Sequence, residues 1–470
     1  MRTKFLLLSA IVATMVCSCG GKTQTEDQNP ILTIDGGHVQ GVVSDSSAVV
    51  VYKGIPYAAA PVGENRWRRP QPVEAWDGVK LADKFGPAAI QHSQSDTTNL
   101  YYKEFYWQGD PVRSEDCLYL NIWTPAGAPA HPDKKLPVAL WIHGGGYVQG
   151  YGHEVTMDGD AWARNGVILV TFNYRLGIMG YLAHPLLSAD DPEHKSGNYG
   201  TYDQIAALKW VKNNISQFGG DPNNIMIFGQ SAGGGSVKNL AVSTPSKGLI
   251  SKAIIQSCGG IDDIVFPGSP TTLQDVEALG KEVMDAAGLT TLEQLRSASV
   301  DEISDAVSKY MQETKKYPSG IQGPFSDGTV TVLGFHDAVM NNTIADVPYM
   351  IGSTTGDGGG AGNNPSIDRF CEVRDSLSSK PVYEYLFARG LPGPGNVGAY
   401  HSSELWFTFH TLGRSWRPFT PADYELSDRM VKAWTSFAKY GNPNGESGNE
   451  WQPYTKENRF RQVFDIQEGK

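Results

Sequence analysis

The chain has 470 residues, of which 40% are hydrophobic and 19% charged, and its formal net charge is −11 at pH 7. A chain of this length can bury a large core, while its acidic balance argues against nucleic acid or an anionic surface as a partner. No Pro- or Ser-rich linker and no internal repeat interrupts residues 30–470, so we predict a single domain there.

The N-terminus has the order of an export signal. Arg2 and Lys4 precede an apolar stretch that ends at Val16 and is followed by small residues. This stretch is shorter than the roughly 20 apolar residues that a membrane span needs. We therefore expect residues 1–18 to be a signal peptide and not a structural element.

The end of this signal resembles a bacterial lipobox. It reads Val-Cys-Ser-Cys, and the cysteine that would receive the lipid is Cys19. Residues 19–29 are polar and are expected to form a flexible tether. These features predict an exported lipoprotein that is anchored in a membrane and faces the periplasm or the cell surface. The alternative is a plain secretory signal that releases a soluble protein.

Apolar runs of strand length recur along the chain between segments that favour helices. Residues 31–55 alternate in a way that suits an antiparallel sheet edge. Apolar side chains recur at three- and four-residue steps in 205–218, which predicts an amphipathic helix packed on the sheet. Residues 270–316 predict charged helices, either of a lid-like region or of a plain solvated face. The other predicted strands are Val138–Ile142, Val167–Phe172, Ile225–Phe228, Ala253–Gln256, Tyr349–Ile351 and Val382–Phe387.

A glycine-rich turn follows the predicted strand that ends at Ile142. His143 precedes three glycines, and glycine lets bare backbone N–H groups approach a ligand closely. We expect the N–H groups of Gly144 and Gly145 to donate to a developing oxyanion. A tight turn that needs glycine for a positive φ is the alternative reading of this triplet alone.

The second motif is Gly-x-Ser-x-Gly at residues 229–233, directly after the strand that ends at Phe228. A strand that turns sharply into a helix exposes the serine hydroxyl, and the two glycines keep side chains out of the turn. This nucleophile elbow makes Ser231 the candidate nucleophile. The N–H of Ala232 would then complete the oxyanion hole.

The chain resembles the type-B carboxylesterases, the family that also contains the cholinesterases and the cholinesterase-like adhesion proteins. Besides the two motifs above, the resemblance rests on blocks in family order at Lys53–Ala58, Ser114–Asn121, Asn173–Arg175, Phe218–Pro222, Ala433–Ala438 and Gly441–Asn444. It implies an α/β-hydrolase fold, with a large, mostly parallel central sheet and an antiparallel N-terminal edge. It also implies helices on both faces of the sheet and lid-like insertions.

The resemblance implies a catalytic triad whose acid and histidine follow the serine in the chain. The block Gly398–Leu405 matches the family's histidine block and identifies His401 as the base. The acid departs from the family, because the loop that usually presents a glutamate carries Asp357 here. The shorter carboxylate can still orient the imidazole if the loop shifts by about an ångström.

Other residues near these blocks are given weaker roles. Asp346 and Asp368 are alternative acids, but both lie off the end of the loop. The family places a serine against the acid at the position of Ser257, and Glu404 follows the histidine by three residues, so both are expected to support the triad. An ordinary strand-end hydroxyl is the alternative for the serine. The aromatic cluster at 101–107 is interpreted as packing or as the lining of an entrance in a loop.

The chain has five cysteines, which is few for an exported protein. The family pairs the cysteine at the position of Cys117 with one upstream, but residues 86–91 contain none, so that bridge is missing. A bond from Cys258 to either Cys117 or Cys371 stays open, with buried free thiols as the favoured state. Because no metal-ligand spacing and no dinucleotide-binding glycine motif is present, we predict no metal and no cofactor.

Together these motifs predict a hydrolase, namely a serine esterase that cleaves carboxylic esters through an acyl-enzyme intermediate. The ester would be carried by a small molecule or a polymer. The alternative is a catalytically silent, cholinesterase-like binding or adhesion protein with the same fold. Such relatives usually lack the serine, whereas this chain keeps Ser231, His401 and a carboxylate.

Overall fold

The computed structural model describes residues 29–45, 47–262, 272–330, 334–357, 364–445, 448 and 450–466. The predicted signal peptide, Cys19 and nearly all of the predicted tether lie outside these residues. Within the described ranges, no helix combines the length and the apolar character that crossing a membrane requires.

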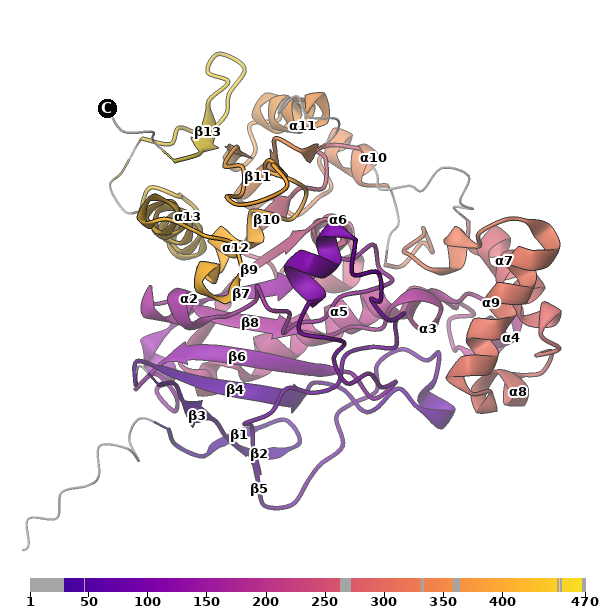
Figure 1. The fold of residues 1–470 in the computed structure, drawn as a ribbon. Coiled ribbons are helices and arrows are strands. Elements are labelled where there is room, and N and C mark those ends of the chain that lie inside the picture. The colour runs from indigo at the N-terminus through magenta and orange to yellow at the C-terminus, as the bar shows by residue number, and fades with distance from the viewer. Residues whose placement is uncertain are drawn as a thin grey trace, which may run out of the picture.

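A ten-stranded sheet forms the centre of the molecule (Figure 1). Its strands are β3 Val42–Val43, β4 Val49–Pro56, β6 Tyr119–Pro125, β7 Leu136–Ile142, β8 Ile168–Phe172, β9 Gly220–Gln230, β10 Lys252–Gln256, β11 Tyr349–Thr354, β12 Val382–Phe387 and β13 Arg461–Phe464. Their order across the sheet is β13-β12-β11-β10-β9-β7-β8-β6-β4-β3. Neighbours from β13 to β8 pair in parallel, and β6, β4 and β3 complete one edge in antiparallel register. The predicted fold class, a mostly parallel sheet with an antiparallel N-terminal edge, is confirmed.

The central strands are apolar on both faces because helices cover both. In β7, Val138 and Leu140 point into one core, and Ala139 and Trp141 point into the other. The helices are α2 Asp160–Arg164, α3 Gly177–Tyr181, α4 Pro185–Asp190, α5 Tyr199–Asn214, α6 Ala232–Val242, α7 Leu273–Ala286, α8 Leu292–Ser297, α9 Val300–Thr314, α10 Phe335–Met340, α11 Pro365–Ser376, α12 Leu405–Thr408 and α13 Pro421–Tyr440. Side chains of α5 and α6 belong to the first core, and those of α2 and α13 belong to the second.

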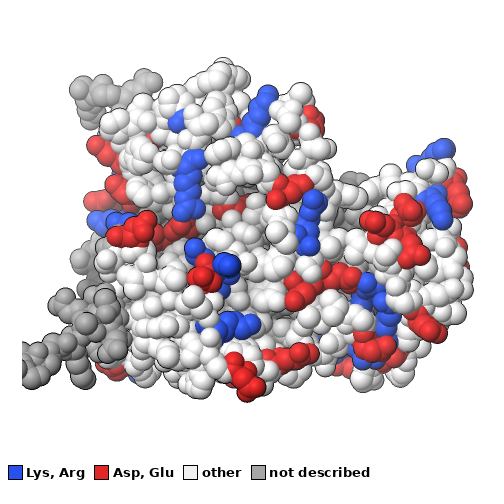
Figure 2. All heavy atoms as spheres, turned by 60° about the horizontal axis from the view of Figure 1, so that its bottom comes forward, with Lys and Arg blue, Asp and Glu red and all other residues white. Residues whose placement is uncertain are grey.

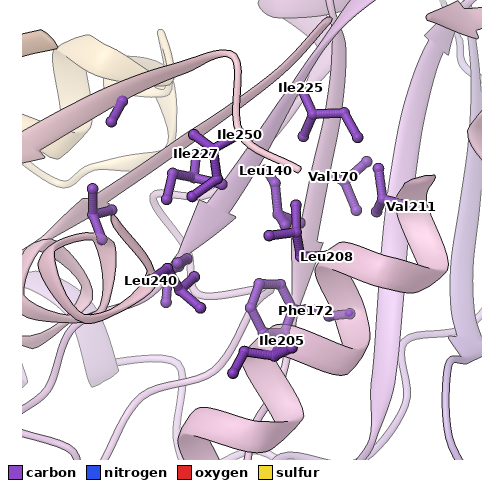
Figure 3. Close-up of a cluster of buried hydrophobic side chains, with 14 of the residues drawn as sticks. Leu140, Val170, Phe172, Ile205, Leu208, Val211, Ile225, Ile227, Leu240 and Ile250 are labelled. Carbon is purple, nitrogen blue, oxygen red and sulfur yellow. The ribbon is translucent and has the colours of Figure 1, made fainter. Parts of the chain in front are cut away.

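The predicted amphipathic helix is α5, followed by one 3-10 turn at Ile215–Phe218. Ile205, Leu208 and Val211 project from α5 toward the sheet (Figure 3). Leu208 lies beside Leu140 of β7, whereas Val211 lies beside Val170 and Ile205 beside Phe172 of β8. Burying such side chains is worth roughly 1.5–3 kcal/mol each, so these contacts hold α5 firmly against the sheet.

The prediction for residues 31–55 is only partly right. Two strands of this segment, β1 Leu32–Ile34 and β2 Gly37–Gln40, leave the edge and form a separate three-stranded sheet with β5 Val79–Leu81. Gly36 and Gly37 have φ of 95° and 155°, which allows the chain to reverse so that β2 pairs back onto β1. Only β3 and β4 join the large sheet.

The helices predicted in 270–316 are present as α7, α8 and α9. They surround an apolar cluster of their own that includes Val283, Leu295 and Ile303. Capping boxes at Thr291 and Ser299 begin α8 and α9. In Figure 1 this group lies to one side of the sheet, next to α4. The helices are therefore confirmed, and their role as a lid stays a prediction.

Charge is mixed across the surface. Figure 2 shows acidic and basic side chains close together over the face that it presents. Several described arginines pair with acids, for example Arg68 with Asp190 at 3.1 Å and Arg69 with Glu193 at 2.6 Å. Such exposed pairs are worth at most about 1 kcal/mol each, so their main effect is to disperse charge and not to stabilise the fold.

Candidate active site

The predicted elbow is present between β9 and α6. β9 ends at Gln230 and α6 begins at Ala232, so Ser231 alone forms the turn. Its φ of 56° and ψ of −125° are values that residues with a side chain rarely adopt. Two hydrogen bonds hold this strained backbone, from Ser231 N to Gln256 O at 2.9 Å and from Gly235 N to Ser231 O at 3.0 Å.

The two glycines of the elbow are required by close packing. A Cβ on Gly229 would lie 2.4 Å from the Gly233 carbonyl oxygen, and a Cβ on Gly233 would lie 2.0 Å from the Ile142 carbonyl oxygen. Neither backbone oxygen can move aside without displacing its strand or helix. The glycine pattern therefore brings the start of α6 against the end of β7, where the oxyanion turn begins.

The acid and the histidine approach the same end of the sheet from two loops. His401 Nδ1 lies 2.5 Å from Asp357 Oδ1, and Thr354 N donates to Asp357 Oδ2 at 2.9 Å. The loops are joined by a hydrogen bond from Gly356 N to Ala399 O, 2.9 Å long. Because the loops pack this closely, aspartate reaches the imidazole although it is one methylene shorter than glutamate.

The electrostatics of this pair suit a general base. Burial lowers the pKa of His401, but the hydrogen bond and charge of Asp357, helped by the charge of Glu404, outweigh burial and leave this pKa above its ordinary value of 6.5. Burial raises the pKa of Asp357, yet the hydrogen bond to His401 and the charge of that ring leave it below 3.8. The carboxylate is therefore ionised and stabilises a proton on the imidazole.

Ser257 and Glu404 lie behind the aspartate. Ser257 Oγ lies 2.6 Å from Glu404 Oε1, and the same hydroxyl is close enough to Asp357 to help to lower the pKa of that carboxyl. Glu404 is completely buried, and burial together with the charge of Asp357 raises its pKa to about 7. The structure thus brings both predicted supporting residues to the acid.

The other ring nitrogen of His401 faces the elbow. Gln230 Nε2 lies 3.3 Å from His401 Nε2, and this glutamine immediately precedes Ser231. In the described part of the chain, no hydrogen bond joins His401 to the Ser231 hydroxyl. Catalytic hydrogen bonds are often long in a free enzyme and tighten when substrate binds.

The oxyanion turn is held through its carbonyl groups. Tyr174 Oη donates to His143 O at 2.9 Å, and His143 Nδ1 lies 2.9 Å from Gly144 O. The N–H of a trans peptide points away from its C=O, so these contacts also direct the N–H groups of Gly144 and Gly145. A Cβ on Gly144 would lie 3.2 Å from the Ser231 Cβ, which places the turn against the elbow. Burial lowers the pKa of His143 to about 4, so this ring is neutral at pH 7.

Some contributions to the site were not predicted from the sequence. Tyr101 Oη donates to the His401 carbonyl oxygen at 3.1 Å across a separation of 300 residues. The aromatic segment is a turn of π-helix at Tyr102–Tyr106 and not a loop. Phe105 and Tyr106 are buried, so both pack in the core and do not line an entrance. Contacts between such distant segments leave no local pattern in the sequence.

The alternative acids are engaged elsewhere. Asp346 Oδ1 accepts from Arg374 at 2.8 Å, and Asp368 Oδ1 accepts from Arg461 at 3.2 Å. Both carboxylates are therefore committed to arginines, whereas Asp357 is bonded to His401. Of the three predicted acids, Asp357 is the one that the structure brings to the imidazole.

The three cysteines of the described chain are free thiols. Cys117 and Cys371 are buried, and Cys258 is half-buried. Burial raises the pKa of Cys258 to about 11, so it is protonated at neutral pH. The favoured prediction of free thiols is confirmed. Across the described ranges, no group of three or more His, Cys, Asp or Glu side chains is arranged to hold a metal ion.

Comparison with known proteins agrees with this geometry. The sequence profile of the carboxylesterase family matches residues 28–366 and 361–470. The chain is 32% identical over 493 residues to fumonisin B1 esterase of Sphingopyxis macrogoltabida, covering 92% of this chain and 86% of that protein. It is 33% identical over 486 residues to para-nitrobenzyl esterase of Bacillus subtilis, covering 93% and 94%.

Solved structures lead to the same family. A PNB esterase matches with a TM-score of 0.77 at 30% identity, covering 93% of this chain and 96% of that one. A carboxylesterase of Geobacillus stearothermophilus matches with a TM-score of 0.75 at 31% identity and the same coverage. The chain therefore belongs to the carboxylesterase family, as a serine carboxylic-ester hydrolase of type B with the α/β-hydrolase fold.

Proposed function

We propose that this esterase works through a catalytic triad of Ser231, His401 and Asp357. The observation that carries the proposal is the 2.5 Å contact between His401 Nδ1 and Asp357 Oδ1, on a ring whose Nε2 faces the elbow. The strained backbone of Ser231 supports it further, because such strain persists where the surrounding structure holds a functional side chain in place.

In the first half of the reaction, His401 Nε2 removes the Ser231 proton while Oγ attacks the ester carbonyl carbon. The carbonyl oxygen becomes an oxyanion that accepts hydrogen bonds from the N–H groups of Gly144, Gly145 and Ala232. Asp357 stabilises the imidazolium that forms. The carbonyl-to-alkoxy C–O bond then breaks, and the alcohol leaves with the proton from His401.

In the second half, water replaces the alcohol. His401 removes a proton from the water as it attacks the acyl carbon, and the acid leaves when the bond to Ser231 Oγ breaks and Oγ regains its proton. The test is a stopped-flow assay with p-nitrophenyl acetate. We expect a burst of one p-nitrophenol per chain before the steady rate. Absence of turnover with a full panel of acyl chains would favour the silent binding protein instead.

The pH dependence follows from the His401 pKa. The base must be neutral, so kcat/KM is expected to fall as the pH drops through this pKa, which lies above 6.5. The measurement is the kcat/KM profile between about pH 5 and 9. Glu404→Gln is a second test: Glu404, whose own pKa is about 7, is partly ionised where His401 titrates, so removing its carboxylate is expected to shift the acid limb slightly to lower pH. A flat wild-type profile from about pH 5 to 8 contradicts the assignment.

We infer further that the enzyme is exported and held on a membrane by a lipid on Cys19. The support is the charged, apolar and small-residue order of 1–18 and the lipobox-like sequence that ends it. Cys19→Ser is expected to move the esterase from the membrane fraction to the soluble fraction of a Gram-negative host. A wild-type enzyme that is soluble and carries no lipid by mass spectrometry would support the plain secretory signal.

A further inference from the structure

A glutamine clamps the far end of the loop that carries the oxyanion turn. Gly150 N donates to Gln91 Oε1 at 2.9 Å, and Gln91 Nε2 donates to Gly150 O at 3.1 Å. One side-chain amide thus satisfies both backbone polar groups of Gly150, as a neighbouring strand would. Gln91 is itself held, because its Nε2 also donates to Ala89 O at 3.1 Å and Arg113 Nη1 donates to Gln91 O at 2.8 Å.

Gly150 lies directly behind the peptide unit that carries one proposed oxyanion donor. A Cβ on Gly150 would lie 2.8 Å from Gly144 O and 2.6 Å from His143 Nδ1. The Gly144 C=O and the Gly145 N–H belong to the same planar peptide unit. Whatever holds the position of that carbonyl therefore also sets the direction of the Gly145 N–H.

We propose that Gln91 is a positioning residue for the oxyanion hole. Its two hydrogen bonds fix the position of Gly150, and this keeps the Gly145 N–H directed at the oxygen of the tetrahedral intermediate. This inference rests on the proposed function of the site. Removing an oxyanion donor costs about 10²–10³ in kcat, and a misplacement of about 1 Å can cost 10², so loss of the clamp is expected to lower kcat by roughly 10- to 100-fold.

The segment that carries Gln91 is also held in place by hydrogen bonds that do not involve the Gln91 side chain. Asn173 Nδ2 donates to Pro87 O at 2.8 Å, and Gly152 N donates to Asn173 Oδ1 at 2.7 Å. Asn173 therefore joins the same two segments at a second point. Removing the Gln91 amide is expected to release Gly150 while leaving both segments folded.

The test replaces Gln91 with methionine, which has a similar length and makes neither hydrogen bond. Gln94→Met is the matched control, because Gln94 Nε2 donates at 2.6 Å to the side chain of Gln149 in the same loop and not to its backbone. The readouts are kcat and KM for p-nitrophenyl acetate and the Ki of an aryl trifluoromethyl ketone, whose serine adduct carries an oxyanion.

For Gln91→Met, kcat and ketone affinity are expected to fall by a similar factor of roughly 10 to 100, with KM within about twofold of wild type. Gln94→Met is expected to match wild type. Unchanged ketone affinity in Gln91→Met, or equal losses in both variants, would overturn the proposal. A wild type that neither turns over ester nor binds the ketone would refute the triad instead.

Gln91→Glu is the second variant, for use if Gln91→Met does not fold. It keeps only the acceptor for Gly150 N, so it is expected to lose ketone affinity. Unchanged ketone affinity in Gln91→Glu would also overturn the proposal.

Discussion

Ser231→Ala is expected to lower kcat for p-nitrophenyl acetate by about 10⁶-fold. The variant cannot form an acyl-enzyme, because alanine has no nucleophilic oxygen. Residual catalysis of about 10³–10⁴ over water is expected from the oxyanion hole and substrate binding. The measurement is steady-state kinetics of freshly purified variant and wild type.

The control for this change is thermal stability. No hydrogen bond of the Ser231 hydroxyl is present in the described residues, and its backbone bonds to Gln256 and Gly235 do not depend on the side chain. The melting temperature is therefore expected to match that of wild type. A folded alanine variant that keeps more than about a hundredth of the wild-type kcat would mean that another residue is the nucleophile.

Asp357→Asn is expected to lower kcat by about 10⁴-fold. A neutral amide at this position holds the His401 ring in the wrong tautomer and withdraws the charge that stabilises the imidazolium. Because that charge also raises the His401 pKa, the remaining activity should have its acid limb at lower pH than wild type. The kcat and pH profiles of the two proteins test both effects.

Asp357→Glu is the matched control, since it keeps the charge and adds one methylene. The hydrogen bond from Gly356 N to Ala399 O holds the two loops at a separation that suits aspartate. The glutamate variant is therefore expected to lose some activity, but its kcat should exceed that of the asparagine variant at least about tenfold. An asparagine variant within about tenfold of wild type would mean that another carboxylate acts as the acid, and Glu404 is the candidate because its charge also raises the His401 pKa.

The centre of this fold could be predicted because its signals are local. Strands buried on both faces are mostly apolar, so the central parts of β7 to β12 are visible as short apolar runs, although β12 carries the buried Glu384, which pairs with Arg461. The elbow and the oxyanion turn are visible for a steric reason. Gly229 and Gly233 sit where a Cβ would collide with backbone, so the packing itself imposes a recognisable residue pattern.

The edge of the fold was harder to predict. β13 has a burial pattern without strict alternation, and β6 lies in a block that was recognised only by resemblance. β1 and β2 have the pattern of edge strands, but periodicity does not say which partner an edge strand will take. β1 and β2 pair with each other across a chain reversal at Gly36 and Gly37, and β2 also pairs with β5.

In the site, the residues that carry chemistry can be recognised from motifs, while the sequence does not show what the residues that position them contact. Tyr101, Gln91 and Tyr174 each act through a single hydrogen bond or amide pair to the backbone of a distant segment. Glutamine and tyrosine in such positions look like ordinary polar residues in the sequence. Only coordinates bring each of them to the carbonyl or glycine that it holds.

The most direct test of the account is covalent labelling with diethyl p-nitrophenyl phosphate. Mass spectrometry of the intact protein and its peptides is expected to show one diethylphosphoryl group per chain, on Ser231, with activity lost in proportion to labelling. The Ser231→Ala variant should stay unlabelled. Stoichiometric labelling of that variant, or modification of wild type at a different residue with the same loss of activity, would contradict the assignment of the nucleophile.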